Sequence, residues 1–295
     1  MAPHAGRHRG GRGCPAGKGA LVAPPRFDLR TGSGALVFTA GALTDGSLAH
    51  GFRVYGVFPN APSDDQLVAV YDGSDGRLRG IVIGGLLGEM RTGATGGVAV
   101  KYLSRPDASG VALIGGGSQA RTQLEAIACV RDVRTVRVCS RTKSSRRAFA
   151  TDMAKRLSLA IEPVDGAEAA MRDADIVVCA TSSRQPVLEA SWILPGAHVS
   201  TIGPKLRDAH ELPLAVAEAS AFIATDSPAQ AEAYDPPFFL AGTPHMDRMV
   251  DLADVVSGRV SVPGAVGGRT LFCSVGLAGT EVAVADVLLR RAASR

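Results

Sequence analysis

The stretch VALIGGGSQAR, residues 111–121, decides the fold expected for this chain. Its first four residues are apolar and predict a short buried strand of a parallel sheet. Gly115, Gly117 and Ala120 follow with the spacing G-x-G-x-x-A, and a helix is expected after them. In dinucleotide-binding folds the first glycine allows a tight turn, the second lets the backbone approach a pyrophosphate, and the third small residue lets helix and strand pack closely. We therefore expect the N-terminus of this helix to bind the phosphates of a dinucleotide.

A second predicted strand, Thr135–Cys139, ends where such folds bind the adenosine ribose. An acidic residue there would bind the 2′-hydroxyl of NAD, but this chain has Arg141, followed by Lys143, Arg146 and Arg147. Cationic side chains suit the 2′-phosphate of NADP. The sequence thus favours NADP(H) over NAD(H). For Arg146 and Arg147 taken singly, a solvated basic helix start is an equally good interpretation.

Strands and helices continue to alternate after this unit, which predicts a doubly wound parallel sheet and an α/β fold. Apolar strands are expected at residues 175–180, 198–202 and 221–225. Ligands bind beyond the carboxyl ends of such strands. Polar residues that follow strand ends are therefore candidates for one crevice: Thr181, Ser182, Lys205, Asp226 and Ser227.

The N-terminal part has a different pattern. Strands are expected at residues 35–39, 51–58, 66–71 and 78–83, which predicts an antiparallel or mixed sheet. We divide the chain into residues 1–24, expected to be disordered, a smaller α+β domain of residues 25–105 with 268–295, and a Rossmann-type domain of residues 106–267.

Composition narrows the class of protein. The net charge of +4 owes much to the first 18 residues, which hold four cations and no acid, so nucleic acid is not an expected partner. No apolar run reaches membrane-spanning length, and the basic start lacks the apolar core of a secretory signal. The five cysteines show no pair spacing and the six histidines no metal-ligand spacing. We expect a cytoplasmic enzyme without a metal site.

Five segments together resemble the ornithine cyclodeaminase/mu-crystallin family. They are MRTGATGGVAVKYL from Met90, ALIGGGSQARTQLEA from Ala112, VCSRT from Val138, ADIVVCATSS from Ala174 and LFCSVG from Leu271. Their order along the chain is that of the family, and the resemblance covers about residue 25 to the end. It implies a Rossmann-type doubly wound sheet plus a smaller α+β substrate and dimerisation domain, and a homodimer that binds NAD or NADP and acts on amino, oxo or imino acids.

The resemblance also implies roles for individual residues. Arg91, in the segment RTGA, matches the arginine that holds the substrate carboxylate, and Arg26 matches a second arginine in P-x-R. With the fingerprint and the strand ends, it implies a set of cofactor-binding residues: Thr92, Gly115, Gly117, Ser118, Gln119, Ala120, Ser140, Arg141, Thr142, Thr181, Ser182, Asp226, Ser274 and Gly276.

Two departures from the family pattern bear on the reaction. The family's active-site lysine falls at Arg53, and the catalytic aspartate of the cyclodeaminases falls at Lys205. Cyclodeamination needs a carboxylate to orient and deprotonate an ammonium group, which Lys205 would repel. Reduction of an already protonated C=N⁺ bond needs a clamped carboxylate and an aimed nicotinamide, and Arg53 can hold a carboxylate although it cannot exchange a proton.

We therefore expect an NAD(P)H-dependent oxidoreductase that reduces an imino acid, or an oxo acid with an amine, with Arg53, Arg91 and Lys205 as its catalytic residues and Arg26, Arg53 and Arg91 as its substrate-binding residues. One alternative is an ornithine or lysine cyclodeaminase in which Asp226 or Asp208 replaces the missing aspartate. Another is a protein that binds NADPH with little catalysis.

Overall fold

The structure is a computed structural model that describes residues 21–44, 46–59, 65–263 and 268–294. The chain divides into two compact units, which we describe separately. Of the described residues, the smaller unit comprises residues 21–44, 46–59, 66–83 and 278–294, and the larger one residues 65, 84–263 and 268–277.

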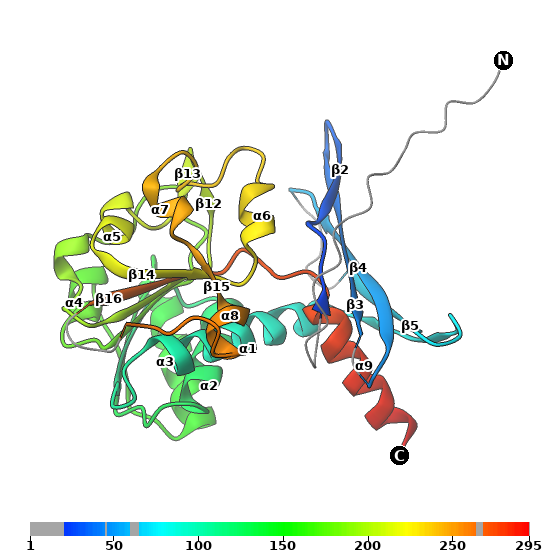
Figure 1. Ribbon diagram of the computed structural model, residues 1–295. Helices are drawn as coiled ribbons and strands as arrows, with labels where there is room; N and C mark the ends of the chain where they lie inside the picture. Colours follow the sequence, from blue (N-terminus) through cyan, green and yellow to red (C-terminus); the bar gives the residue numbers. More distant parts are fainter. Residues whose placement is uncertain (1–20, 45, 60–64, 264–267, 295) are drawn as a thin grey trace. The chain divides into compact units, whose positions relative to one another are not determined.

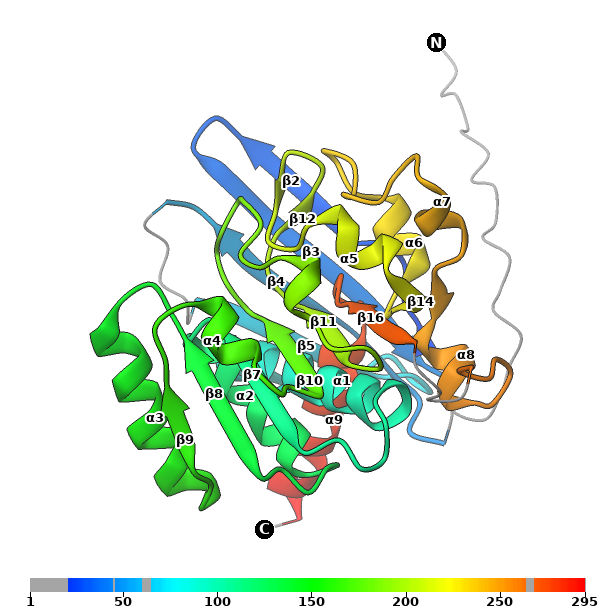
Figure 2. The same ribbon diagram turned by 90° about the vertical axis from the view of Figure 1, so that its left-hand side faces the viewer.

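The larger unit is built on a parallel sheet, which in the described residues has eight strands in the order β15-β14-β16-β11-β10-β7-β8-β9 (Figure 2). Every adjacent pair of strands runs parallel. The strands are β7 (Gly110–Ile114), β8 (Thr135–Cys139), β9 (Ile161–Pro163), β10 (Ile176–Cys179), β11 (His198–Thr201), β14 (Ser220–Thr225), β15 (Val250–Asp251) and β16 (Arg269–Cys273). This order is that of a doubly wound α/β fold, which confirms the predicted fold class.

Helices cover both faces of this sheet (Figure 1). The helices on one face are α1 (Leu86–Leu103), α2 (Ser118–Ala128), α3 (Lys143–Leu157) and α8 (Leu252–Val256). The other face is covered by α4 (Ala167–Met171), the 3₁₀ turn η1 (Ala190–Trp192), α5 (Leu214–Glu218) and α6 (Pro228–Glu232), with α7 (Pro244–Asp247) following. A separate hairpin joins β12 (Lys205–Leu206) to β13 (Ala209–His210).

The register of the strands brings the expected site residues to one edge of the sheet. Cys139, Ile114, Cys179, Thr201 and Cys273 lie opposite one another on successive strands. The next residues of all these strands therefore begin loops at the same edge, as ligand-binding loops do in this class of fold.

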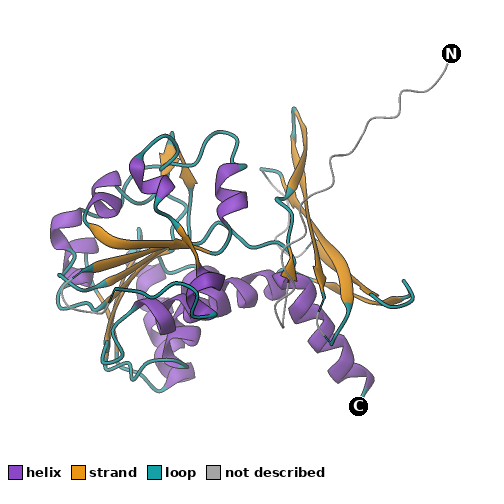
Figure 3. Cartoon of the chain, viewed as in Figure 1, coloured by secondary structure: helices purple, strands orange, loops and turns teal. Residues whose placement is uncertain are grey.

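The smaller unit is an antiparallel sheet packed on one helix (Figure 3). Its described strands follow the order β1-β3-β4-β5-β6, and β2 also pairs with β3. Its elements are β1 (Leu21–Val22), β2 (Phe27–Thr31), β3 (Gly34–Leu43), β4 (Ala49–Val57), β5 (Gln66–Asp72), β6 (Leu78–Ile83) and α9 (Thr280–Ala293).

Close backbone approaches fix α9 to one face of this sheet. A Cβ atom on Gly41 would lie 2.3 Å from the Cα of Gly279, and one on Gly80 would lie 2.6 Å from Leu289. Residues of the opposite face alternate with these along each strand. That face includes large apolar side chains that are mostly exposed: Phe27, Leu29, Leu36, Leu78, Ile81 and Ile83.

Several elements differ from the sequence prediction. Residues 1–20 of the segment expected to be disordered lie outside the described residues, but Leu21 and Val22 form β1 because they pair with Leu43 and Ala42. Residues 244–256, for which the sequence analysis gives no element, hold the two short helices α7 and α8 with β15 between them. The C-terminal helix α9 begins at Thr280, directly after Gly279, whose φ of 82° is left-handed.

The compact units also differ from the predicted domain boundaries. Helix α1 and residues 268–277 belong to the larger unit, although we expected them in the smaller domain. For α1 the reason is its close packing on α2, where a Cβ atom on Gly93 would lie 2.5 Å from the carbonyl oxygen of Thr122. Strand β16, which lies between β11 and β14 in the large sheet, explains the second difference.

Candidate functional site

The G-x-G-x-x-A turn has the geometry of a phosphate-binding loop. Gly115 has a φ of 112°, and a Cβ atom there would lie 2.3 Å from the carbonyl oxygen of Ala180. No atom of the described residues lies within 4 Å of the position of a Cβ atom on Gly117, so the backbone there is open to an approaching ligand. Gly117 begins α2 without a side-chain cap, which leaves the N–H groups of the first turn available to an anion. Ala120 is completely buried, as close packing requires.

Gln119 adds a polar atom with no assigned role in the fold. Its side-chain oxygen Oε1 is buried and has no hydrogen-bond partner among the residues that the structure describes. Buried polar atoms are nearly always paired, so such an atom in the first turn of α2 is a sign of a missing ligand. Gln119 is the second residue of α2, next to the open backbone of Gly117.

The loop after β8 is strongly basic. Thr142 caps α3 by accepting a hydrogen bond from the backbone N–H of Ser145 at 3.2 Å, and Ser140 donates to the carbonyl of Thr142. Helix α3 has no acid in its first turn and instead begins with Lys143, followed by Arg146 and Arg147. Cations at a helix N-terminus oppose the helix dipole, so this arrangement favours the binding of an anion.

A buried glutamate, Glu211, joins the ends of β10 and β11. Its carboxylate accepts hydrogen bonds from the N–H and the hydroxyl of Thr181, at 2.8 and 2.7 Å, and from the hydroxyl of Thr201 at 2.9 Å. It also accepts from the N–H groups of Ile202 and Gly203. Glu211 is not among the site residues that the sequence predicts. The five bonds fix two of the loops in which ligand contacts were expected.

Asp226, after β14, is held in a similar way. Oδ1 accepts the N–H of Val275 at 2.7 Å and Oδ2 accepts that of Leu277 at 3.2 Å, while Gly276 donates to both oxygens. The hydroxyl of Ser274 donates to Oδ2 at 3.4 Å. Asp226 is 3% exposed. Both oxygens of the Asp226 carboxylate therefore accept hydrogen bonds from the turn that follows β16, and the group is poorly placed to accept a proton from a substrate.

Two cationic residues lie near this turn. Arg91, in the second turn of α1, has its guanidinium nitrogens 3.7 and 3.8 Å from the position of a Cβ atom on Gly276. Lys205 is buried and donates from Nζ to the carbonyl of Gly203 at 2.5 Å. The charges of Lys205 and Asp226 both act on the pKa of Cys273, which places them near that thiol at the end of β16.

Other predicted residues occupy different surroundings. Thr92 lies in the contact between α1 and α2, where its hydroxyl donates to the carbonyl of Gly88 and its own carbonyl accepts from Gln123. Ser118 and Ser182 are exposed, and Arg26 lies half-buried at the start of β2 in the smaller unit. Asp208 is exposed in the turn between β12 and β13.

Arg53 lies in the core of the smaller unit. Its guanidinium donates to Glu281 of α9 at 2.9 Å and to Gln66, and it stacks over Tyr55 at 4.4 Å. Arg53 is 9% exposed and Glu281 1% exposed. The positive charge predicted to bind a substrate carboxylate is thus already balanced by a carboxylate of the protein.

Three cysteines line up at the ends of the strands but are poor nucleophiles. Burial raises the pKa of Cys139 to about 11 and of Cys273 to about 12, and it raises the pKa of Cys179 well above its usual range. All three thiols stay protonated near neutral pH, so they do not support nucleophilic catalysis.

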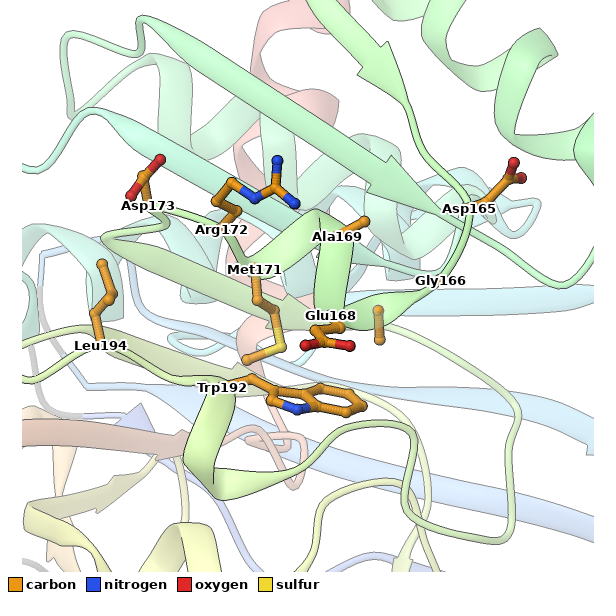
Figure 4. A pocket seen from close by; sticks show the side chains of 10 residues that line it. Asp165, Gly166, Glu168, Ala169, Met171, Arg172, Asp173, Trp192 and Leu194 are labelled. Atoms are coloured by element: carbon orange, nitrogen blue, oxygen red, sulfur yellow. The ribbon is translucent and has the colours of Figure 1, made fainter.

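A hollow of about 650 Å³ lies beside α4, at a different place from the predicted site residues. In Figure 4, Met171 and Glu168 point toward the ring of Trp192, and Asp165 lies at one end with its carboxylate directed away. None of the predicted site residues lines this hollow. In the described part of the chain, no three His, Cys, Asp or Glu side chains form a group suited to a metal, and no helix is long and apolar enough to cross a membrane.

Comparison with known proteins establishes the family. The model of the ornithine cyclodeaminase/mu-crystallin family matches residues 16–295. The chain belongs to this family, which confirms the resemblance of the five segments.

The similar proteins include reductases of imino acids. The Δ1-pyrroline-2-carboxylate reductase of Bacillus cereus strain ZK is 28% identical over 86% of this chain and 81% of its own length. The structure of the Thermococcus litoralis enzyme of that name, in complex with NADH and L-proline, has a TM-score of 0.85 and 29% identity over 93% of this chain and 88% of the other. The iminosuccinate reductase of Paracoccus denitrificans with NAD⁺ has a TM-score of 0.81 and 26% identity, over 93% and 87% of the two chains.

A putative dehydrogenase of Rhizobium meliloti matches over a shorter stretch. It is 37% identical over 161 residues, which are 54% of this chain and 49% of the relative. The chain spans about half the length of this relative and of an uncharacterised cyclodeaminase of Sinorhizobium fredii.

Proposed function

We propose that the protein is an NADPH-dependent reductase of imino acids. The observation that carries this proposal is the hydrogen bonding of the two buried carboxylates near the strand ends. Glu211 and Asp226 each accept five hydrogen bonds, most of them from backbone N–H groups. Neither carboxylate is available to deprotonate an ammonium group, which cyclodeamination requires. Hydride addition to a protonated C=N⁺ bond needs no such base.

The residues of the G-x-G-x-x-A loop fit a nicotinamide dinucleotide. Ser118 and the open backbone of Gly117 would face the pyrophosphate, and the buried oxygen of the Gln119 amide could accept a hydrogen bond from a hydroxyl group of the cofactor. Thr181 and Ser182 would border the cofactor at the end of β10. Ser274 and Gly276 would border it at the end of β16. The bound nicotinamide would supply a hydride to the substrate carbon.

The preference for NADP(H) is proposed from charge. Arg141, Lys143 and Arg147 are exposed, and none of their side chains makes a hydrogen bond or an ion pair with another residue that the structure describes. Ser140 and Thr142 add hydroxyl groups next to them. A 2′-phosphate carries up to about two negative charges at neutral pH, which such a cluster would bind.

In the proposed reaction the residues anchor the substrate. Arg91 holds its carboxylate close to Gly276, so that the C=N⁺ carbon is presented to the nicotinamide. Arg53 and Arg26, which lie in the smaller unit, remain predictions from the sequence as carboxylate ligands, and Glu281 balances the charge of Arg53. Lys205 repels a substrate ammonium group and can donate a proton where the substrate is a ketone. The reductases of pyrroline-2-carboxylate and iminosuccinate among the relatives support this choice of substrate class.

We further propose that two copies form a homodimer through the apolar face of the smaller sheet. Phe27, Leu29, Ile81 and Ile83 are 63, 51, 50 and 77% exposed on this face. Contiguous exposed apolar surface marks a protein interface. A related archaeal alanine dehydrogenase has been solved as a dimer with bound NAD, at a TM-score of 0.83 and 25% identity.

The decisive experiment follows the absorbance of NADPH with Δ1-pyrroline-2-carboxylate, other cyclic imino acids, and oxo acids with ammonia or methylamine. We expect oxidation of NADPH with an imino acid and no proline from ornithine.

Arg91→Lys should lower kcat/KM by about 100-fold because a single ammonium replaces a fork of donors. Asp208→Asn, in an exposed turn, is the control and should leave the rate unchanged. Formation of proline from ornithine would reject the proposed reductase and show that the protein is a cyclodeaminase. Binding of NADPH without any turnover would reject both enzymes and indicate a protein that binds NADPH with little catalysis.

A further inference from the structure

An acidic side chain lies against the basic cluster that follows β8. Strands β8 and β9 are parallel neighbours, with Val138 opposite Pro163, so the loops after them leave the sheet at the same edge. The loop after β9 carries Asp165, which forms an ion pair with Arg146 of α3. One of the four cations expected to bind phosphate is therefore held by a carboxylate of the protein.

Arg146 differs from the other cations in its surroundings. Its side chain is 11% exposed, and it also donates to the carbonyl of Ser140 at 3.4 Å. It lies close enough to Cys139 for its charge to act on the pKa of that thiol. Arg146 thus sits beneath the loop that would hold the ribose, at a depth where a charge interaction is less screened by solvent.

The side chain of Asp165 contributes little to the stability of the fold. Its side chain is 84% exposed, and in Figure 4 its carboxylate points away from Trp192 and the hollow beside α4. The two strands are already joined across their surface by Arg137 and Glu162, at 3.1 Å. A change at Asp165 should therefore alter the charge of the loop without unfolding it.

We propose that Asp165 determines the strength of the cofactor preference by competing with the 2′-phosphate for Arg146. This inference rests on the proposed binding of NADPH at the cluster of Arg141, Lys143 and Arg147. A carboxylate beside the phosphate also repels it directly. NADH presents a neutral hydroxyl group at the same position and meets neither penalty. Asp165 therefore limits affinity for NADPH and leaves affinity for NADH unchanged.

The test is a titration of the full-length protein with NADPH and with NADH, followed by the fluorescence of the nicotinamide. Asp165→Asn should lower the Kd of NADPH by about threefold to fivefold, with less effect at high salt, because exposed charge pairs have modest and screened energies. The Kd of NADH should stay within about twofold. In the background of Arg146→Gln, the same change at Asp165 should bring a smaller gain, because the competition for Arg146 is gone and only the direct repulsion of the phosphate is relieved.

Asp132→Asn is the matched control. Asp132 is an exposed acid paired with Arg134, before β8 and therefore at the opposite edge of the sheet. The substitution Asp132→Asn removes one negative charge, as Asp165→Asn does, and should alter neither the Kd of NADPH nor that of NADH. A weaker binding of NADH in Asp165→Asn would overturn the inference, since Asp165 would then be a ligand of the ribose. An unchanged Kd of NADPH would overturn it too, while the wild-type preference for NADPH would still uphold the proposed cofactor. Failure of the wild-type protein to bind either cofactor would reject both.

Discussion

Single residues in this protein have their chemistry set by what surrounds them. Asp226 would be a plausible base from its place after a strand, yet its carboxylate is wrapped by the N–H groups of residues 275–277. Arg53 would be a plausible carboxylate ligand, yet it is paired with Glu281 in the core of the smaller unit. In both cases a buried charge is satisfied inside the protein, which is the state that low-dielectric surroundings require.

Replacing Asp226 should loosen the turn after β16. Asp226→Asn puts an amide N–H₂ group where the backbone donors need an acceptor, and hydrogen bonds to a charged group are worth about 1.5–3 kcal/mol. We expect a loss of about 2–3 kcal/mol in the free energy of unfolding, measured in urea. Asp254→Asn, whose carboxylate pairs with Arg259 at the surface, is the control and should cost under about 1 kcal/mol. Equal losses in the two variants would contradict the assigned role.

His198 makes stability depend on pH. It is fully buried between Thr270 and Ser200, at 2.8 and 2.9 Å. Because the hydroxyl of Thr270 donates to the carbonyl of Leu103, it accepts from Nδ1, and Ser200 donates to Nε2. Burial, with a smaller contribution from the charge of Arg131, lowers the pKa of His198 from 6.5 to about 3.

The native state therefore keeps His198 neutral where the unfolded chain binds a proton. Stability from this residue is complete above about pH 6.5 and falls as the pH drops toward 3, by up to about 1.4 kcal/mol per pH unit. Urea unfolding of the wild type and His198→Gln at pH 7.5, 6.5 and 5.5 measures this effect. The variant should be less stable at pH 7.5 and should show the shallower loss on acidification. Parallel pH profiles would show that another group is responsible.

At the scale of elements, α1 is shaped by its contact with α2. Its glycines let the two backbones approach, with Gly93 against Thr122 and Gly97 against Ala126. At its C-terminus, Arg131 donates to the carbonyls of Lys101 and Ser104 and to that of Val100, which also accepts the N–H of Ser104. Burial lowers the pKa of Arg131 from its usual value. This packing holds Arg91 on a rigid element beside Gly276.

A methyl group in this contact should be costly. Gly93→Ala would gain about 1 kcal/mol in helix propensity but would place its Cβ 2.5 Å from the backbone oxygen of Thr122, which cannot move aside. We expect a net destabilisation of about 1–3 kcal/mol in thermal or urea unfolding. Val98→Ala, at a position that is 38% exposed on the same helix, should cost less than about 1 kcal/mol. A stabilised Gly93→Ala would show that α1 and α2 are less tightly packed.

At the scale of the whole molecule, the two compact units differ in how they bury their apolar surface. The large parallel sheet is covered on both faces, as parallel sheets require. The smaller sheet has α9 on one face, while the other keeps Phe27, Leu29, Ile81 and Ile83 exposed. This asymmetry is the physical basis of the proposed dimer.

Charges on this open face should weaken association. Ile81→Lys combined with Ile83→Lys places two like charges in the proposed interface, and burying them costs several kcal/mol. Sedimentation equilibrium should show a dimer for the wild type and a monomer, or a dimer weakened by at least about 100-fold, for the variant. Leu288→Lys, on an exposed position of α9, is the control and should remain dimeric. A wild-type monomer, or a dimer that tolerates both lysines, would reject this interface.

The sequence alone was enough for what depends on local pattern. The G-x-G-x-x-A turn, the parallel strands with their polar ends and the family segments predicted the α/β fold, because apolar runs and turn residues act over a few neighbours. The limits of β6 and β8 agree with prediction to the residue. Short elements with little apolar pattern, such as β2 and the β12–β13 hairpin, were missed, because pairing with distant residues creates them.

Which charged side chains have a partner inside the protein depends on the tertiary structure. No local pattern shows that Glu211 collects donors from two strand ends, that Arg53 meets a carboxylate 228 residues away, or that Asp165 pairs with Arg146. These pairings depend on where the fold brings separate segments together, and desolvation then makes an unpaired alternative too costly. The sequence therefore determined the class of fold and led to the proposed place of the site, while the packing of the chain determined which of its polar residues already have partners inside the protein.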